Sequence, residues 1–467
     1  MFRSTMSKIL SLVLLLSLGG VVAGVTYRYY QTHSSSWLYD KGLKALERGD
    51  VRGAERQTTL LEQKGDTARV HLLRGRIWLS AALAAVKRAK APPPYAQAQE
   101  TGQMVLAGAT LDRYSVVVRP AAWLSACLVQ NPRAASVPGR KELRRALAEF
   151  AQIRDEGALG LDATLVAAKC LMQLEQKRSA AEGLNAVLAR YPDHLEAHRL
   201  LAAIYIDLNS PGNAITHLRA WARQDPNSGL PYRWIGFFEK DSSATGTSAI
   251  EAYREALKRE LSPRLRARVV EELAAVLMGQ DGRFQEALEV LDQCPDEFKN
   301  TPVVLTLRTE CLTSLGKDRE AAELLDQIVR HHPDTPHVLW LRAKAYVDEK
   351  RSRDALPLLE KAVRLDPHDY QSQVSLAGVY EQLGDKVKAR QHRRVAEETH
   401  KVKEQLGDLY RQAVGQPWND SIRCQMAVLC LQINRTRDAR TWLQAALASN
   451  PNNAWAHQLL VHIGHAP

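Results

Sequence analysis

Apolar residues recur at helical spacing along most of the chain, and proline interrupts them at regular intervals. Leu359 and Val363, four residues apart, lie on one face of a predicted helix. That helix is predicted to end in "RLDPHDY", residues 364–370. Pro367 lacks an N–H and disfavours helical geometry in the residue before it. The same stop signal occurs 34 residues earlier, at Pro333, so the interval itself needs an explanation.

A set of small residues at fixed spacing, called a ladder below, precedes each of these prolines. Before Pro367 it consists of Ala343, Ala355 and Ala362, separated by twelve and seven residues. The first residues of successive ladders are Ala168, Ala202, Ala275, Thr309, Ala343, Ala377 and Ala427. The middle residues are Ala180, Ala214, Ala249, Ala287, Ala321, Ala355, Ala389 and Ala439, and four of the seven steps between them are 34 residues. We expect these positions where paired helices approach closely, because only short side chains leave room there.

Glycine stands five residues before several of the middle alanines. Gly282, Gly316 and Gly384 have this place, and Gly49 stands in the same relation to Ala54. Because glycine readily adopts the positive φ that ends a helix, each repeat is predicted to consist of two helices joined by a short turn. The proline then ends the second helix, so the opening stretch is the junction between stacked helical hairpins.

This pattern resembles the tetratricopeptide repeat family over most of residues 161–467, with seven or eight copies in register. The resemblance implies an all-α fold, an α-solenoid of stacked antiparallel helix hairpins that forms a right-handed superhelix. The step from Ala389 to Ala439 is 50 residues, which predicts a lengthened helix that breaks at Gly415 and Pro417. An early copy is expected near Ser35, followed by a first helix with Gly75 as its small residue.

The predicted organisation combines these repeats with a proline-rich insertion at "KAPPPYAQAQET". Its parts are a short cytoplasmic end at 1–8, a transmembrane signal anchor at 9–26, degenerate helical repeats with the insertion at 35–160, the repeat array at 161–403, and a linker helix, last repeat and capping helix at 404–467.

The amino terminus has two interpretations. Arg3 and Lys8 precede an uncharged apolar run over residues 9–26, and a Tyr-Arg-Tyr-Tyr cluster follows at residues 27–30. As an uncleaved anchor, the run is near the lower length limit for spanning a bilayer, and the aromatic cluster suits a membrane interface. We favour this interpretation, with the repeats on the extracytoplasmic, periplasmic side. The alternative is a signal peptide cleaved near Ala23, which leaves a secreted or periplasmic protein.

Charge and motifs exclude several classes of function. The net charge is +11, but the basic residues are spread along the chain and aromatic residues are only 6%, so no nucleic acid is expected as a partner. The strongest basic run, residues 386–403, is interpreted as a charged helix face, with a docking surface for an acidic partner or lipid headgroups as the alternative.

The chain also lacks the sequence signals of a cofactor or metal site. The six cysteines have no CxxC spacing and fall in apolar helical patterns, so they are interpreted as core residues. Two histidine groups, near His331 and near His462, lack the supporting arrangement of a metal site. No catalytic or nucleotide-binding motif occurs, so we expect neither enzyme activity nor cofactors.

In the family that the chain resembles, the first helices of the repeats line the concave surface that binds ligands. The resemblance therefore implies partner contacts at Lys169, Arg199, Glu310, Trp340 and Lys344. It does not favour binding of a chaperone carboxyl terminus, because matching asparagines are absent. We interpret the chain as a membrane-anchored scaffold or adaptor that binds proteins or peptides in an envelope assembly or export process. The alternative is a regulatory or substrate-recruiting part of an enzyme complex.

Overall fold

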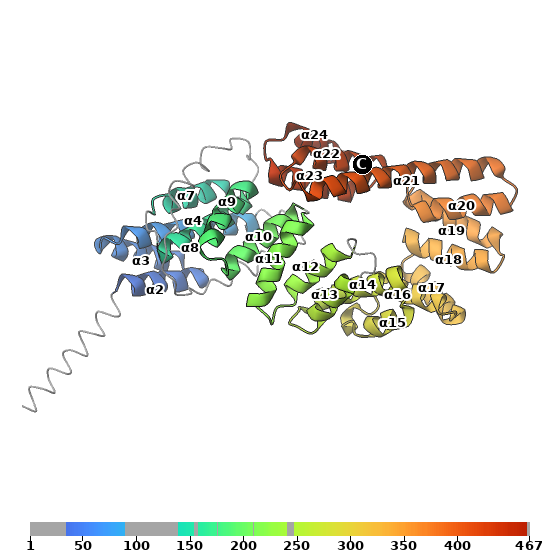
Figure 1. Ribbon diagram of the computed structural model, residues 1–467, viewed down its shortest axis with the longest axis horizontal. Coiled ribbons are helices and arrows are strands. Elements are labelled where there is room, and N and C mark those ends of the chain that lie inside the picture. Colours follow the sequence, from blue (N-terminus) through green and yellow to red (C-terminus); the bar gives the residue numbers. More distant parts are fainter. Residues whose placement is uncertain are drawn as a thin grey trace, which may run out of the picture. The chain divides into compact units, whose positions relative to one another are not determined.

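The computed structural model describes residues 34–88, 139–153, 157–174, 176–208, 210–240 and 247–464, which divide into two compact modules. Every regular element of the described residues is helical, apart from one isolated β-bridge between Ser228 and Glu260. The predicted all-α fold is confirmed. The N-terminal module ends at Pro192, and its helices are α2 (Ser35–Glu47), α3 (Val51–Gln63), α4 (Thr67–Arg88), α7 (Arg140–Phe150), α8 (Ala158–Gln173) and α9 (Lys177–Arg190) (Figure 1).

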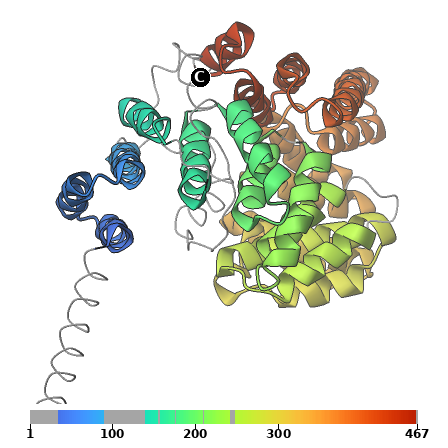
Figure 2. The same ribbon diagram turned by 60° about the vertical axis from the view of Figure 1, so that its left-hand side comes forward.

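The C-terminal module begins at Asp193 and consists of stacked hairpins that end in a single helix (Figures 1 and 2). Its α-helices are α10 (Leu195–Asp207), α11 (Pro211–Gln224), α12 (Leu230–Glu239), α13 (Thr247–Leu257), α14 (Pro263–Asp281), α15 (Phe284–Asp292), α16 (Pro302–Ser314), α17 (Asp318–His331), α18 (Pro336–Asp348), α19 (Ser352–Leu365), α20 (Tyr370–Gln382), α21 (Lys386–Val414), α22 (Asp420–Gln432), α23 (Thr436–Ser449) and α24 (Ala454–Gly464).

The small residues lie where the ladder predicted them. All eight middle alanines are between 0% and 3% exposed, and each is near the start of the second helix of a hairpin. The turn glycines Gly49, Gly282, Gly316 and Gly384 all have positive φ, between 62° and 90°. These small side chains let the two helices of each hairpin pack closely, and the core continues from one hairpin to the next.

One repeat departs from the predicted register. Ala275 was expected at the helix crossing of α14, but it is exposed, whereas its neighbour Ala274 is fully buried. The end of α14 explains the shift, because Arg283 N–H bonds the carbonyl of Leu277, six residues back. At the corresponding turn after α16 the bond spans five residues, from Lys317 to Leu312. The extra residue turns the helix face by about 100°, so the buried position moves one residue earlier.

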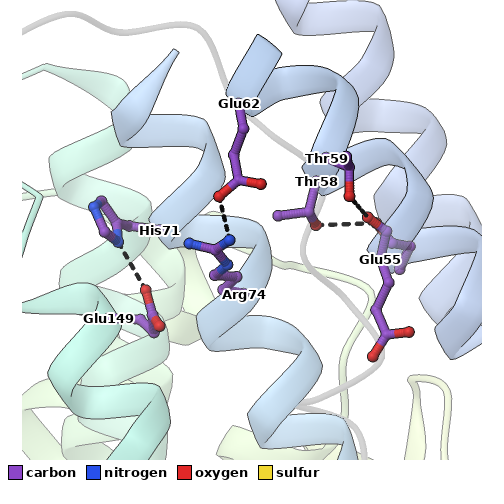
Figure 3. A network of polar contacts seen from close by, with 8 residues as sticks. Glu55, Thr58, Thr59, Glu62, His71, Arg74 and Glu149 are labelled. Carbon is purple, nitrogen blue, oxygen red and sulfur yellow. Dashed lines mark hydrogen bonds and ion pairs between the residues drawn. The ribbon is translucent and has the colours of Figure 1, made fainter. Parts of the chain in front are cut away.

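The early copy predicted near Ser35 is the hairpin α2–α3, and the repeat after it is interrupted within its hairpin. Gly75 on α4 packs so closely against α7 that a Cβ there would lie 2.2 Å from the ring of Phe150, which is fully buried. Figure 3 shows the polar contacts around this pair: Arg74 bonds Glu62 on α3, and His71 Nδ1 lies 2.7 Å from Glu149 Oε2 on α7. Helices α4 and α7 are thus the two halves of one hairpin, although about fifty residues separate them in sequence.

Near the carboxyl end the lengthened helix is confirmed. Helix α21 spans 29 residues, and Gly415 caps it. Its first turn is fixed by Asp385, whose carboxylate accepts from the N–H of Lys388 at 3.1 Å. The predicted capping helix is α24, which begins at Ala454. Asn453, directly before it, accepts a hydrogen bond from the N–H of Ala456 through its side chain.

Three sequence predictions fall outside the described residues: the anchor at 9–26, the proline-rich insertion and Cys127. Among the helices that are described, none is both long enough and apolar enough to cross a membrane. The other five cysteines are buried free thiols, as predicted for core residues. Burial raises the pKa of Cys170 to about 12 and that of Cys430 to about 11, so neither thiol is reactive at neutral pH.

Candidate functional site

Three consecutive first helices, α16, α18 and α20, present matching positions at intervals of 34 residues. Local signals fix where each helix starts: Pro302 and Pro336 stand in the first turns of α16 and α18, and the Asp369 side chain caps α20 through the N–H of Ser372 at 2.9 Å. Because the helices begin in register, equivalent side chains face the same way. We call this surface the first-helix face; its members are Val303, Glu310, His337, Trp340, Lys344, Gln371, Val374, Ser375 and Gly378.

Trp340 is the centre of the first-helix face. Its indole is half-buried and packs against the core between the hairpins. The indole N–H donates to Ser375 Oγ at 2.9 Å, which joins α18 to α20. The His337 imidazole stacks on the indole, with ring centroids 5.3 Å apart and planes 22° apart. The tryptophan is therefore held rigidly while part of its ring stays accessible.

Charged groups of both signs flank the tryptophan. Glu310 Oε1 lies 2.5 Å from His337 Nε2, which joins α16 to α18, and these side chains are 28% and 44% exposed. The Lys344 ammonium lies 5.7 Å from the centroid of the Trp340 ring, within the range of a cation–π contact. A ligand on this face would meet a carboxylate, an imidazole and an ammonium around one aromatic platform.

Apolar groups extend the platform on both sides. Val303 on α16 is 53% exposed and Val374 on α20 is 43% exposed. Gly378 occupies the place on α20 that Lys344 occupies on α18, and a Cβ added there would meet nothing within 4 Å. The face thus combines exposed apolar side chains with an open stretch of helix, which suits close approach by another polypeptide.

The five sequence-predicted contact residues fall into two groups. Glu310, Trp340 and Lys344 lie together on the first-helix face. Arg199 lies on α10, where it pairs with Asp225 and covers the ring of Trp221 at 5.1 Å. Lys169 belongs to the N-terminal module and is only 8% exposed. That any of the five contacts a partner stays a prediction.

The corresponding face of the N-terminal module is occupied by its own side chains. Tyr39 O–H on α2 donates to Asp162 Oδ2 on α8 at 3.1 Å, and Arg76 on α4 bonds both oxygens of the same carboxylate at 2.5 and 2.7 Å. Burial, together with the Asp162 charge, raises the pKa of the Tyr39 phenol. These bonds engage the Asp162 carboxylate within the N-terminal module, whereas the aromatic and charged groups of the first-helix face are partly accessible.

Sequence reasoning missed His337, Ser375 and Gly378 as members of the face. A usable signal existed, because stacked first helices bring one place on a helix next to a nearby, offset place on the following helix. Glu310 and His337 are 27 residues apart, seven fewer than one repeat, and Trp340 and Ser375 are 35 apart. Once the 34-residue register is known, such offsets identify neighbours across helices.

The described residues contain no group of three or more histidine, cysteine, aspartate or glutamate side chains that could hold a metal ion. In the first predicted histidine group, His331 bonds the carbonyl of Gln327 and His337 bonds Glu310. In the second, His457 bonds the carbonyl of Pro451. These histidines are engaged locally, and the arrangement supplies contacts for a ligand and no evident reactive group.

Two family models match the chain, both described as tetratricopeptide repeat. One matches residues 280–345, and the other matches residues 165–229, 247–299 and 341–401. No curated protein matches the chain. Tetratricopeptide repeats are therefore found in segments between α8 and α21, with α12 outside the matches and the whole first-helix face inside them.

Solved structures with similar folds include other tetratricopeptide repeat proteins. TTC0263 of Thermus thermophilus, described as a thermophilic protein of this class, is 19% identical, with a TM-score of 0.26, and 44% of this chain covers all of it. YrrB, described as having an unusual peptide-binding site, is 16% identical, with a TM-score of 0.34. The match covers 41% of this chain and 96% of YrrB. MamA of MSR-1 is 18% identical, with a TM-score of 0.27. The match covers 37% of this chain and 97% of MamA. These values carry no argument about what this chain binds.

Proposed function

We propose that this protein is a non-enzymatic interaction scaffold whose first-helix face binds an extended segment of another protein. Tetratricopeptide repeats bind proteins and peptides, which supports the general class of function. The single observation that carries the location is the cluster of Glu310, His337, Trp340 and Lys344, in which a rigid aromatic platform lies among accessible charges of both signs.

The energetics of binding favour this face. Aromatic side chains that are already held in place lose little conformational entropy when a ligand covers them. Trp340 is such a group, because its indole N–H bond to Ser375 and its stacking on His337 fix the ring before a partner arrives. Exposed Val303 and Val374 would add apolar area on either side.

Site-specific photocrosslinking in the native cell tests the proposed surface. A photoreactive amino acid at Val374 should give discrete protein adducts, and the same residue at Val387, which is 70% exposed on α21, serves as the matched control. Adding Lys344→Glu should diminish the Val374 adducts, because it reverses a charge beside Trp340. Equal adducts from Val374 and Val387, unchanged by Lys344→Glu, would refute binding on this face.

The proposal includes the membrane and the compartment. We place the uncleaved anchor at residues 9–26 and the repeats on the extracytoplasmic side, in service of an envelope assembly or export process; the charge and aromatic pattern of the first thirty residues supports this. An anchored chain stays with membranes in high salt and leaves them only in detergent. In spheroplasts, added protease should digest the repeats together with a periplasmic control; survival of the repeats would place them in the cytoplasm. A mature chain that starts near Gly24 would establish cleavage instead.

The non-enzymatic part of the proposal has its own test. The sequence offers no catalytic motif, and the first-helix face offers ion-paired and hydrogen-bonded groups in place of an activated nucleophile. We expect no turnover when the purified chain without residues 1–33 is assayed against panels of hydrolase and transferase substrates. Reproducible turnover that a substitution on this chain abolishes would overturn the assignment.

A further inference from the structure

Arg423 on α22 is a charged side chain with no exposure to solvent. Its Nε and Nη2 donate to the carbonyl of Leu208 at 3.2 and 2.7 Å. Its Nη1 donates to the carbonyl of Asn419 at 2.8 Å, with a longer contact to that of Gln416 at 3.5 Å. Burial lowers the pKa of the guanidinium to about 10, and Asp420 opposes that shift, so the group stays charged at neutral pH.

The carbonyls around Arg423 come from one helix end and from the loop before α22. Leu208 caps the carboxyl end of α10, whereas Gln416 lies in that loop and Asn419 caps the amino end of α22. Carbonyl groups at the carboxyl end of a helix lack partners within the helix and carry the negative end of its dipole. The buried charge of Arg423 is thus stabilised by the carboxyl end of α10, and the loop before α22 supplies its other acceptors.

The contact between Arg423 and Leu208 joins residues that are far apart in sequence, unlike the contacts by which a repeat array stacks. In such arrays each hairpin packs only on its neighbours, so contacts are local in sequence. Arg423 and Leu208 are 215 residues apart, and they connect the first hairpin of the C-terminal module, α10–α11, to its last, α22–α23. A second contact supports the same junction: the rings of Tyr205 on α10 and Trp418, in the loop before α22, lie 6.2 Å apart.

We infer that Arg423 is a latch that holds the first and last hairpins of the C-terminal module together and that, when released, lets the array open. The hairpins between them stack through their own cores, which do not depend on the latch. The module therefore has two arrangements, closed and open, with the same helices in both. A partner that binds only the open array must break the latch, so its affinity depends on the identity of residue 423.

Hydrogen exchange and small-angle X-ray scattering on the full chain test the latch. In Arg423→Met the amides within residues 205–211, where Pro211 has no N–H, should exchange at least about tenfold faster, because hydrogen bonds to a charged group are lost there. The radius of gyration should rise, while the amides of α18 and α23 keep their protection. Arg437→Met, the same substitution at an exposed arginine on α23, should change neither measurement.

Two results would overturn the inference. If Arg423→Met leaves both exchange at 205–211 and the radius of gyration unchanged, the array is not held by this side chain. If instead α23 loses protection, Arg423→Met has unfolded the last hairpin, and Trp418→Gln then decides. That substitution lies in the loop before α22 and removes the ring contact to Tyr205, the second contact at this junction. It should raise exchange at 205–211 with α23 intact, and no rise there would refute the latch.

Discussion

Replacing Ala274 and Ala275 separately by leucine tests the packing of the repeats most sharply. The two alanines are neighbours on α14, yet Ala274 is fully buried in a core cluster with Ala287 and Leu291, whereas Ala275 is exposed. Both substitutions add the same three carbon atoms to the same helix. Any difference between them therefore reports the helix face and not the helix propensity, which is similar for alanine and leucine.

The magnitude follows from the absence of space. With room available, three buried carbon atoms would contribute roughly 0.8 kcal/mol each, but at a close helix crossing they force the helices apart. Overpacking of this kind costs typically 1–3 kcal/mol, so Ala274→Leu should lower the free energy of unfolding by about that amount. For a domain of about 250 residues this corresponds to a fall in Tm of roughly 2–4 °C per kcal/mol. Ala275→Leu should change it by less than about 0.5 kcal/mol.

Urea denaturation followed by far-UV circular dichroism measures the difference. Hydrogen exchange of α14 and α15 localises it, because repeat arrays open locally. Destabilisation by Ala275→Leu alone would mean that α14 keeps the twelve-residue spacing of the other repeats and that its longer terminal turn is wrong. Equal destabilisation by both would mean that the crossing does not depend on one small residue.

Three further predictions concern glycine, turns and pH. Gly75→Ala should destabilise the protein by about 1–3 kcal/mol, because the added Cβ would lie 2.2 Å from the Phe150 ring. Gly378→Ala, where the added Cβ meets nothing within 4 Å, should stabilise it by about 0.5–1 kcal/mol. Thermal melts that rank the two variants in the opposite order would contradict the close packing of α4 on α7. Lys350→Gly should stabilise the protein by about 1 kcal/mol in urea titrations, since Lys350 has a φ of 61° at a turn where other repeats have glycine. Asn434→Gly should stabilise it less, because asparagine tolerates positive φ better than lysine does. Burial, and after it the charge of His198, lowers the pKa of His217 to about 4. The stability that neutral His217 contributes is therefore complete above about pH 6.5 and is lost as the pH falls toward about 4, by at most about 3 kcal/mol. His217→Phe should flatten the dependence of unfolding free energy on pH in this window, and an unchanged dependence would refute the assignment.

The repeat could be predicted because it depends on local signals that recur. A small residue is required wherever two helices cross closely, and glycine supplies the backbone geometry of the turn, so both signals are visible in sequence. Lys350 and Asn434 show the limit of this reading, because they adopt the positive φ of the turn without being glycine. The shift from Ala275 to Ala274 shows another limit: a single extra residue before Gly282 leaves the alanine spacing intact but rotates the helix.

Contacts between repeats were harder to predict because each depends on the geometry of two helices at once. Glu310 and Lys344 were identified as candidates from their helix places, yet the pairing of Glu310 with His337 depends on how far α18 is offset along α16. Arg423 is the extreme case. In sequence it is one arginine among 63 basic residues, on a helix whose pattern gives no reason to bury a charge. The carboxyl end of α10 and the loop before α22 supply the carbonyls that make that burial favourable, and sequence spacing contains no information about their meeting.

The latch and the first-helix face place different demands on the same array. Binding on α16, α18 and α20 needs neighbouring first helices in fixed register, which the bonds from Trp340 to Ser375 and from Glu310 to His337 already supply locally. Opening at Arg423 leaves those bonds intact, because they lie on hairpins other than α10–α11 and α22–α23. The local geometry of the site should therefore be the same in the closed and open arrays. What the latch controls is whether a partner longer than the site can reach beyond it, so the two functions can be separated by substitutions at Lys344 and at Arg423.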